Sequence, residues 1–439
     1  MTAVNRIRWR DASPETRQRI MGRAGRDVAI QEDVVAAICR EVKERGDPAL
    51  LEYTERFDGI ALSAGQMAVT EEDFLEARNQ VDQRTLHILQ YAAGNIRRFH
   101  EAQKPAPMWM MDIDEGIMAG EKVTPIPDVA LYVPRGKGSF PSVLLMLGTP
   151  AVVAGVPRIV VLTPPNEQGG VDPAILCVAD LLGIREVYKV GGAQAVAAAA
   201  YGTATIPKCS KIIGPGNPYV SAAKRLLARD IDPGVPAGPS EAVILADEWA
   251  NPEKAALDLL IEAEHGPDSA ALLVTHSIPL ADKVIARVQS LVAEIVSDVR
   301  RRYVETVLQQ YGGVIITENI ESSLAFVNEY APEHMEVMVR DPFSVLPKIR
   351  HAGEILLGEH TPITLCNFLL GPNAILPTGR QARTVSAVSL WDFLKRSSIG
   401  YVTEEGFAKV RDMAAEFADL EGFETHATAL RRRPPSEQK

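Results

Sequence analysis

Cysteine is the first thing this sequence has little of. Among 439 residues there are only four, Cys39, Cys177, Cys209 and Cys366, and they lie far apart without a CxxC pair. Such spacing supports neither a disulfide framework nor a thiolate metal site. The cysteine usage therefore favours a reducing cytoplasm as the location of the protein.

Long apolar runs and an excess of positive charge are also missing. The most apolar stretch, residues 143–162, is interrupted by glycine, proline and arginine, so it does not predict a membrane span. No apolar signal segment stands at the N-terminus. With 46 basic and 57 acidic side chains the net charge is -11, which argues against nucleic acid or a membrane as the main partner.

The first hundred residues carry helix signals. Residues 1–30 are polar and Arg-rich and predict an N-terminal arm. An apolar stripe predicts a helix over 32–45, and Asp47-Pro48 and Thr70 followed by Asp73 are helix-start patterns. A fourth helix is expected over 86–102. No residue pattern in this region indicates a catalytic site.

From Val129 onward, short apolar runs alternate with helical segments. The chain is long enough for two or more domains. Strands are predicted at 129–133, 159–163, 186–190, 242–245, 271–275, 314–317 and 355–357. Repeated strand, glycine turn, helix and strand is typical of parallel sheets with right-handed crossovers. The sequence therefore predicts an α/β fold with two doubly wound modules.

Three glycine-containing loops accompany these strands: Val190-Gly-Gly-Ala-Gln194, Gly214-Pro-Gly-Asn217 and Pro236-Ala-Gly-Pro-Ser240-Glu241. None is a GxGxxG or a Walker loop, so a standard dinucleotide fingerprint is absent. Open α/β sheets bind ligands at such loops, and helix N-termini behind them favour phosphate. Tight turns without a ligand are the alternative.

Glu262 and His265 are the first candidate metal ligands. They stand three residues apart at the end of a predicted amphipathic helix, which Gly266-Pro267 terminates. A carboxylate and an imidazole on one helix face can hold one metal ion. A solvated acidic helix end is the alternative, because a zinc site needs at least one more ligand from elsewhere.

Further candidates lie downstream. Glu333 and His334 follow a helix and a proline, in a predicted loop suited to general acid–base chemistry, although an exposed acidic turn has the same pattern. Asn367 lies in a polar segment before Gly371-Pro372. His426 follows Glu421 by five residues near the C-terminus, where a lone histidine is usually solvent exposed.

These segments together resemble the histidinol dehydrogenase family over nearly the whole chain. The motifs that carry the resemblance are Tyr132-Val-Pro134, the three glycine loops, Ala263-Glu-His-Gly-Pro-Asp-Ser269, Pro332-Glu-His334, Leu376-Pro-Thr378 and His426. The resemblance implies two incomplete Rossmann-like modules and a homodimer with an intersubunit active site. It also implies NAD+ and Zn2+ as cofactors, and oxidation of an alcohol through an aldehyde to an acid.

The resemblance also implies residue roles. Tyr132, Gln194 and Asn217 would line the NAD+ site, Glu333 would activate the water of the second step, and His334 would be the general base. Zinc would be held by Glu262, His265, Asn367 and His426. The expected substrate site contains Ser240, Glu262, His265, His334, Asn367, Glu421 and His426.

Four departures from the family pattern bear on the substrate. Glu262 stands where the family has glutamine and Asn367 where it has aspartate, so the charge of the metal site is unchanged. Ala374 replaces a histidine near the substrate, and Arg135 replaces a glycine. These changes favour a small polar alcohol other than histidinol. L-histidinol itself is the first alternative, and a non-catalytic NAD- or metal-binding paralogue is the second.

The predicted domain boundaries complete the expectations. Residues 1–30 form the arm. Residues 31–131 and 241–380 form a first module with the metal and catalytic residues, and residues 132–240 a second module on the NAD+ side. Residues 381–439 form a helical tail that reaches the partner subunit.

Overall fold

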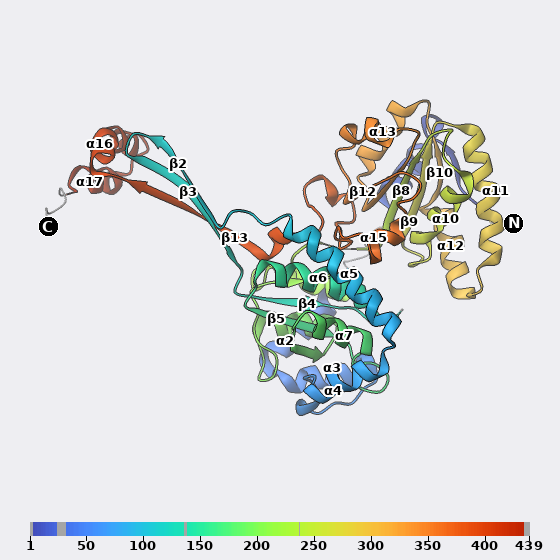
Figure 1. The fold of residues 1–439 in the computed structure, drawn as a ribbon, viewed down its shortest axis with the longest axis horizontal. Coiled ribbons are helices and arrows are strands. Elements are labelled where there is room, and N and C mark those ends of the chain that lie inside the picture. The colour runs from blue at the N-terminus through green and yellow to red at the C-terminus, as the bar shows by residue number, and fades with distance from the viewer. Residues whose placement is uncertain (1–2, 24–31, 136–137, 237, 434–439) are drawn as a thin grey trace. The chain divides into compact units, whose positions relative to one another are not determined.

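The computed structural model describes residues 3–23, 32–135, 138–236 and 238–433. The chain divides into two compact units, labelled by element in Figure 1. Unit 1 comprises Met1–Gln103 and Pro127–Phe393, and unit 2 comprises Lys104–Ile126 and Leu394–Lys439. Among the described residues, no helix combines the length and apolar character that crossing a membrane requires.

A six-stranded sheet forms one half of unit 1, and all of its strand pairs are parallel. From one side to the other its strands are β1 (Arg6–Arg8), β10 (Gly313–Ile316), β9 (Ala270–Thr275), β8 (Glu241–Ala246), β11 (His334–Met338) and β12 (Glu354–Leu357). The four middle strands are entirely buried and mostly apolar, as expected for a parallel sheet covered on both faces, with Glu241, His334 and Glu336 as the ionisable exceptions.

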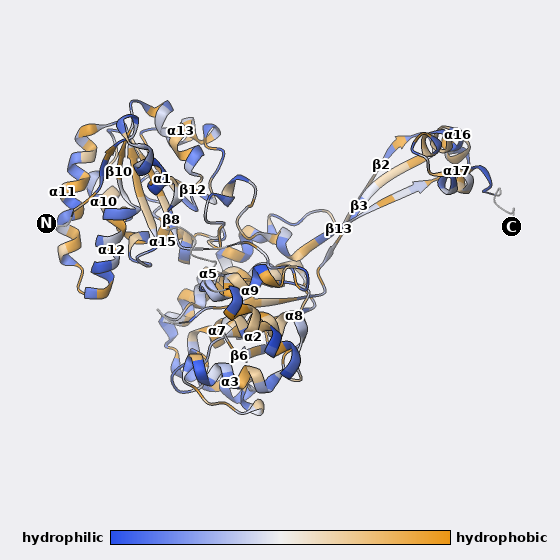
Figure 2. Cartoon of the chain, turned by 180° about the vertical axis from the view of Figure 1, so that it is seen from behind, coloured by the Kyte–Doolittle hydropathy of each residue, from blue (hydrophilic) through white to orange (hydrophobic). Residues whose placement is uncertain are grey.

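Two groups of helices cover this sheet. Ile244 and Leu273 pack with α10 (Pro252–Ala263), α11 (Ile278–Glu294) and α12 (Asp298–Gln310), whereas their neighbours Val243 and Leu272 pack with α1 (Pro14–Gly22) and α13 (Ile320–Tyr330). Alternate residues of each strand thus face opposite helix layers. Figure 2 colours the strands mainly hydrophobic and α11 in alternating hydrophobic and hydrophilic turns. The short helices α14 (Pro342–Val345) and α15 (Ile363–Phe368) flank β12 in sequence.

A four-stranded parallel sheet forms the other half of unit 1. Its strand order is β6 (Glu186–Lys189), β5 (Arg158–Thr163), β4 (Asp128–Tyr132) and β7 (Ile212–Ile213). Its core is shared with α2 (Glu32–Arg45), α3 (Asp47–Asp58), α8 (Gly192–Tyr201) and α9 (Pro218–Leu226). A second group of helices packs together: α4 (Glu71–Gln80), α5 (Gln83–Glu101), α6 (Pro141–Ala154) and α7 (Pro173–Leu181).

Unit 2 is an antiparallel sheet with two helices. Its strands, in order, are β13 (Leu394–Val402), β3 (Ile117–Pro125) and β2 (Met108–Asp114), followed in sequence by α16 (Glu404–Leu420) and α17 (Glu424–Arg431). The remaining elements are 3-10 turns, at Trp9–Asp11, Ala64–Gln66, Leu346–Lys348, Gln381–Arg383 and Leu390–Phe393.

The predicted fold class is confirmed, and the helix over 32–45 has the predicted bounds. The predicted module boundaries differ from the packing. Helices α2 and α3 share the core of the four-stranded sheet, and α4 and α5 pack on its helices α7 and α6, although all four were assigned to the other module. Arg6–Arg8 of the predicted arm pair with β10. Unit 2 joins residues 104–126 to the predicted tail through the pairing of β3 with β13. Local patterns predict the elements but do not say on which sheet each one packs.

Candidate active site

One group of predicted residues lies where the strands of the four-stranded sheet end, at its carboxyl edge. Tyr132 ends β4, and its hydroxyl oxygen accepts a hydrogen bond from Gly192 N at 3.0 Å. Burial raises the pKa of Tyr132 to about 12, so the hydroxyl stays protonated. Gln194 on α8 is buried, and among the described residues neither its amide oxygen nor its amide nitrogen has a hydrogen-bond partner. Buried amides are rarely left unpaired, so these atoms fit a polar ligand.

The glycines of this edge are required by close approach. Gly192 has φ +67° and a Cβ there would lie 2.4 Å from Gln194 Oε1, whereas a Cβ on Gly214 would lie 2.1 Å from Tyr132 O. Asn217 caps α9, its Oδ1 accepting from Val220 N at 3.1 Å. The N-termini of α8 and α9 both follow strand ends here, an arrangement that favours phosphate. These residues fit NAD+.

A buried lysine holds the second glycine loop. Lys224 on α9 donates from Nζ to Gly214 O at 2.7 Å, and burial lowers the pKa of its amine to about 7. Arg135, one of the departures from the family pattern, also lies at this edge, where it donates to Pro165 O at 3.3 Å. The extra cation therefore lies at the edge that is predicted to hold the cofactor.

The candidate catalytic residues and the first two candidate metal ligands lie where strands of the six-stranded sheet begin, at its amino edge. Glu241, His334 and Glu354 are the first residues of β8, β11 and β12, and His334 is in register with Glu354. Glu262 and His265 are at the end of α10, which precedes β9. The prediction of a loop position for His334 is wrong: the residue is buried in a strand, because the chain enters β11 directly after Pro332-Glu333.

His334 is surrounded by carboxylates. Its Nε2 lies 3.9 Å from Glu262 Oε1 and 3.8 Å from Glu333 Oε1, and its Nδ1 is hydrogen-bonded to Glu354 Oε1. Burial lowers the pKa of His334, but the three carboxylates outweigh burial and raise it to about 10. A cation beside Glu262 would offset one of these charges and move the ring towards the pKa of a useful base.

Glu333 is the second candidate proton carrier. Its Oε2 accepts from Glu241 N at 2.9 Å, while Oε1 faces His334. Burial raises the pKa of Glu333 well above its usual value, with further contributions from Glu262 and Glu241. A carboxylate with a raised pKa is a stronger base than an ordinary glutamate, so Glu333 suits proton transfer.

Glu262 supplies the test of whether a metal fits. The residue is buried, and both of its carboxylate oxygens lack a hydrogen-bond partner in the described part of the chain. Oε2 is 3.5 Å from Nδ1 of His265, a contact too long for a hydrogen bond, and that Nδ1 lies 3.1 Å from Ile261 O. A buried carboxylate without a donor is costly unless a cation compensates it. Glu262 and His265 therefore fit two ligands of one metal ion.

The other predicted site residues lie on other elements. Asn367 is half-buried on α15, and Ser240 is half-buried just before β8. Glu421 and His426 are exposed residues of unit 2. Within the described ranges, no group of three His, Cys, Asp or Glu side chains is gathered in a way that could hold a metal. The full ligand set stays a prediction.

Sequence reasoning missed several buried ionisable residues. Glu354 is one, and its second oxygen accepts from the Cys366 thiol, whose pKa burial raises. Glu336 is another: its Oε1 accepts from Ile363 N at 2.7 Å, at the start of α15. Burial raises the pKa of Glu336 and, to about 6, that of its neighbour Asp258. The sequence signal that could have identified these residues is a glutamate within an otherwise apolar predicted strand.

Arg23 and Glu241 form a further buried pair that was missed. Arg23 Nε lies 2.7 Å from Glu241 Oε1, and its guanidinium carbon is 3.8 Å from the ring centroid of Tyr330. The same carboxylate oxygen accepts from Gly379 N at 2.7 Å. Because Glu241 N also binds Glu333, this pair fixes the strand end beside the candidate proton carrier.

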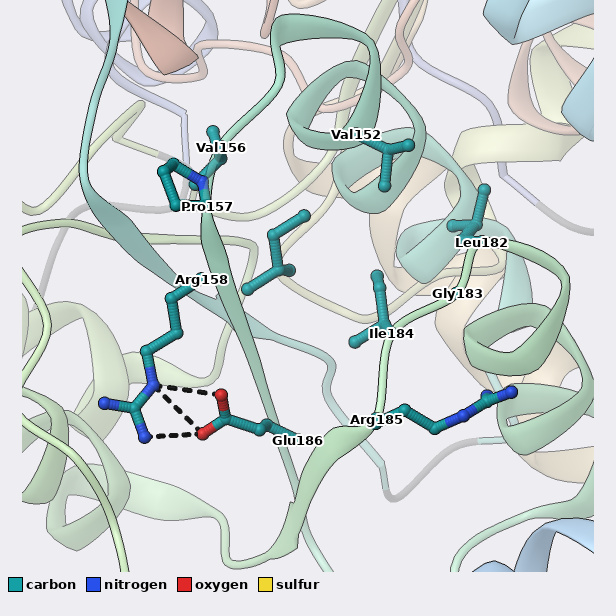
Figure 3. A pocket seen from close by; sticks show the side chains of 10 residues that line it. Val152, Val156, Pro157, Arg158, Leu182, Gly183, Ile184, Arg185 and Glu186 are labelled. Carbon is teal, nitrogen blue, oxygen red and sulfur yellow. Dashed lines mark hydrogen bonds and ion pairs between the residues drawn. The ribbon is translucent and has the colours of Figure 1, made fainter.

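A separate concavity of about 310 Å³ lies where β5 and β6 begin (Figure 3). Apolar side chains including Val152, Leu182 and Ile184 line it, and the bidentate ion pair of Arg158 with Glu186 borders it. It contains none of the predicted site residues and lies at the end of the four-stranded sheet opposite the cofactor edge.

Comparisons with known proteins agree on one family. The model of the family described as histidinol dehydrogenase matches residues 21–434. A protein of Colwellia psychrerythraea named histidinol dehydrogenase homolog is 49% identical over 424 residues, which is 96% of this chain and 95% of the relative. A Synechocystis protein named histidinol dehydrogenase is 49% identical over 400 residues, 91% and 92% of the two chains.

A solved structure agrees with the fold. The crystal structure of histidinol dehydrogenase from Elizabethkingia anophelis matches this chain with a TM-score of 0.91 and 33% identity, and the match covers 96% of each chain.

Proposed function

The chain belongs to the histidinol dehydrogenase family, a family of NAD-dependent oxidoreductases that act on CH–OH groups, and on that premise we propose that it oxidises an alcohol with His334 as general base. The observation that carries the proposal is the buried cluster of His334, Glu333 and Glu262, in which Nε2 of the ring faces two carboxylates. A merely structural cluster would have no reason to leave the oxygens of Glu262 without donors.

The proposal assigns a separate role to each group of site residues. Bound NAD+ would supply the hydride acceptor, one molecule for each oxidation, and bound zinc would supply Lewis acidity. His334 Nε2 takes the hydroxyl proton, and Glu333 can take a proton from water in a second oxidation of the aldehyde to the acid. Tyr132, Gln194 and Asn217 hold the cofactor, while Glu262, His265, Asn367 and His426 hold the metal. Ser240 and Glu421 contact the substrate.

We infer that the active form is a homodimer with intersubunit sites. Unit 2 exposes large apolar side chains on its strands and on α16, a surface that a second copy of the chain would cover: Met108, Trp109, Met111, Ile113, Met413, Phe417, Leu420 and Phe423. In such a dimer Glu421 and His426 complete the partner's site. The buried, unpaired cysteines support a cytoplasmic location.

A mixing experiment tests this arrangement. His334→Ala and His426→Ala chains should each be inactive alone. If the two residues act in different chains, a mixed dimer contains one intact site, so refolding the variants together should restore part of the activity. Unchanged inactivity of the mixture, with mixed dimers verified by differential tagging, would contradict the intersubunit site.

Two substrate classes are supported by different observations. L-histidinol is supported by the Synechocystis relative, which is named histidinol dehydrogenase and is 49% identical. A small polar alcohol without an imidazole is supported by Ala374, which packs beside Ile363 and Cys366 and offers no polar side chain there.

Two assays decide between these classes. NAD+ reduction with L-histidinol and with a panel of small alcohols compares kcat/KM directly, and complementation of a histidine auxotroph tests histidinol oxidation in cells. A chain that reduces NAD+ with no alcohol of the panel and does not complement would instead be a non-catalytic paralogue. The presence of both Glu333 and His334 argues against that outcome.

A further inference from the structure

Glu354 contacts the imidazole of His334 at the nitrogen that the proposed proton transfer does not use. The two residues are directly in register on the neighbouring parallel strands β11 and β12, so their side chains leave the sheet on the same face. Glu354 Oε1 accepts the hydrogen bond of His334 Nδ1. A pairing at the first position of two strands is set by the sheet itself and leaves the ring little freedom to turn.

The carboxylate of Glu354 is itself held in place. Its second oxygen accepts from the thiol of Cys366 on α15. Cys366 is fully buried in a small core with Ala242, Leu356 and Ile363. Both oxygens of Glu354 therefore have partners on packed elements, and the acceptor presented to His334 has a fixed position.

The other ring nitrogen is in a different situation. Nε2 is 3.9 Å from Glu262 Oε1 and 3.8 Å from Glu333 Oε1, beyond hydrogen-bond distance. In a neutral imidazole one nitrogen is the donor and the other the acceptor, and the bond made by one nitrogen decides which is which. A carboxylate at Nδ1 selects the form with the hydrogen on Nδ1 and the lone pair on Nε2.

We propose that Glu354 is a positioning residue for the general base: it fixes the ring orientation and the tautomer of His334, so that Nε2 presents its lone pair between Glu262 and Glu333. The inference rests on the proposed function, in which His334 takes the alcohol proton. Glu354 itself acts only through His334. Its role is that of the partner which orients a catalytic histidine in other enzymes.

Two substitutions at one position test the role in turnover. Glu354→Gln keeps an oxygen that can accept from Nδ1 and should lower kcat about 10-fold, whereas Glu354→Ala removes the acceptor and should lower kcat about 100-fold. KM for NAD+ and for the alcohol should stay within about twofold, because the interaction matters in the chemical step. Zinc content should be unchanged in both variants.

Asp47→Asn is the matched control for losing a buried carboxylate. Asp47 is not among the residues of the proposed site, and its Oδ2 accepts a hydrogen bond from Thr205 Oγ1 at 2.6 Å. The control should keep wild-type kcat even if its melting temperature falls. If Glu354→Ala kept kcat within about threefold of wild type, or if both Glu354 variants lost activity equally together with zinc, the positioning role would be refuted.

A measurement without substrate separates this inference from the proposed function. In zinc-loaded protein labelled with 15N-histidine, the ring signals of His334, assigned with His334→Asn, are followed as the pH is raised until the ring is neutral, and should then report hydrogen on Nδ1 in the wild type. Glu354→Ala should give a tautomer mixture. An unchanged tautomer refutes the positioning role. If His334→Ala remains active while Glu354→Ala shows the mixture, the proposed function fails and the positioning of the ring stands.

Discussion

The two edges that carry the candidate site are built on opposite ends of their sheets. At the carboxyl edge of the four-stranded sheet, helices α8 and α9 begin, and the site residues Tyr132, Gln194 and Asn217 are uncharged. At the amino edge of the six-stranded sheet, α10 ends, and Glu262, Glu333 and Glu354 gather around His334. Helix N-termini favour anions and helix C-termini favour cations.

This difference explains which ligand fits where. The cofactor edge offers glycine backbone and helix starts, which suit the phosphates of NAD+. The amino edge of the six-stranded sheet offers buried carboxylates and a helix end, which suit a metal cation. The carboxylates of Glu262, Glu333 and Glu354 outweigh the burial of His334 and raise its pKa to about 10. Parallel α/β sheets usually bind their ligands at the carboxyl ends of the strands. In the six-stranded sheet, the residues of the proposed catalytic cluster lie at the amino ends instead.

Removing the metal should have the largest effect, because it tests whether the acidic edge of the six-stranded sheet depends on a cation while the other edge does not. If the carboxylates of the amino edge need a cation, purified protein should contain about one zinc per chain. Chelation should reduce alcohol oxidation to background while leaving NAD+ binding at the other edge intact. Atomic absorption, the rate of NADH formation and NAD+ titration by fluorescence measure the three quantities. Full activity of metal-free protein would show that the acidic edge works without a cation.

Truncating the base should give the next largest effect. His334→Ala should lower kcat on the order of 10²- to 10⁴-fold, with NAD+ affinity nearly unchanged, because the imidazole acts in the chemical step at an edge that does not hold the cofactor. His276→Ala is a matched control, since its Nε2 also faces a carboxylate, Glu248, at 3.5 Å. The control should retain wild-type kcat. Loss of cofactor binding in His334→Ala would remove His334 from the chemical role.

Exchanging the charges of two predicted ligands should have an intermediate effect. Glu262→Gln removes the carboxylate from the proposed zinc site and should weaken zinc binding. Asn367→Asp adds a carboxylate, which should tighten zinc but lower kcat, because added negative charge offsets the Lewis acidity. The double variant restores one carboxylate and one amide and should recover zinc content relative to Glu262→Gln.

The interaction between the two positions is the quantity to measure. Zinc affinity and kcat of the wild type, the single variants and the double variant give a coupling energy, expected at about 0.5–3 kcal/mol for residues in one site. Strictly additive effects would mean that Glu262 and Asn367 do not meet at one metal. The charge exchange would then have no bearing on the substrate either.

The sequence located the glycine loops at the carboxyl edge of the four-stranded sheet better than the carboxylates at the amino edge of the six-stranded sheet, for physical reasons. Glycine turns and the Asn217 cap are local signals, so the loops after β6 and β7 could be recognised residue by residue. Glu354 gave no such signal, because its role depends on its register with His334, twenty positions earlier, and pairing of parallel strands is non-local. For the same reason β3 and β13 were not predicted, because their residues pair across 269 (394 − 125) to 285 (402 − 117) positions to form the sheet of unit 2.

The smallest expected effect tests the electrostatics of the cofactor edge. Asn217→Asp keeps an oxygen that caps α9, so the melting temperature should hold, but it places negative charge at a helix start meant for phosphate. A penalty of about 1 kcal/mol raises KM for NAD+ about fivefold. Asn217→Ala should instead lose about 0.5–2 kcal/mol of stability. Asn319→Asp, at the cap of α13 beside the other sheet, should change neither quantity. If Asn217→Asp left KM unchanged at low salt, where screening is weakest, the phosphates of NAD+ would not lie at the start of α9.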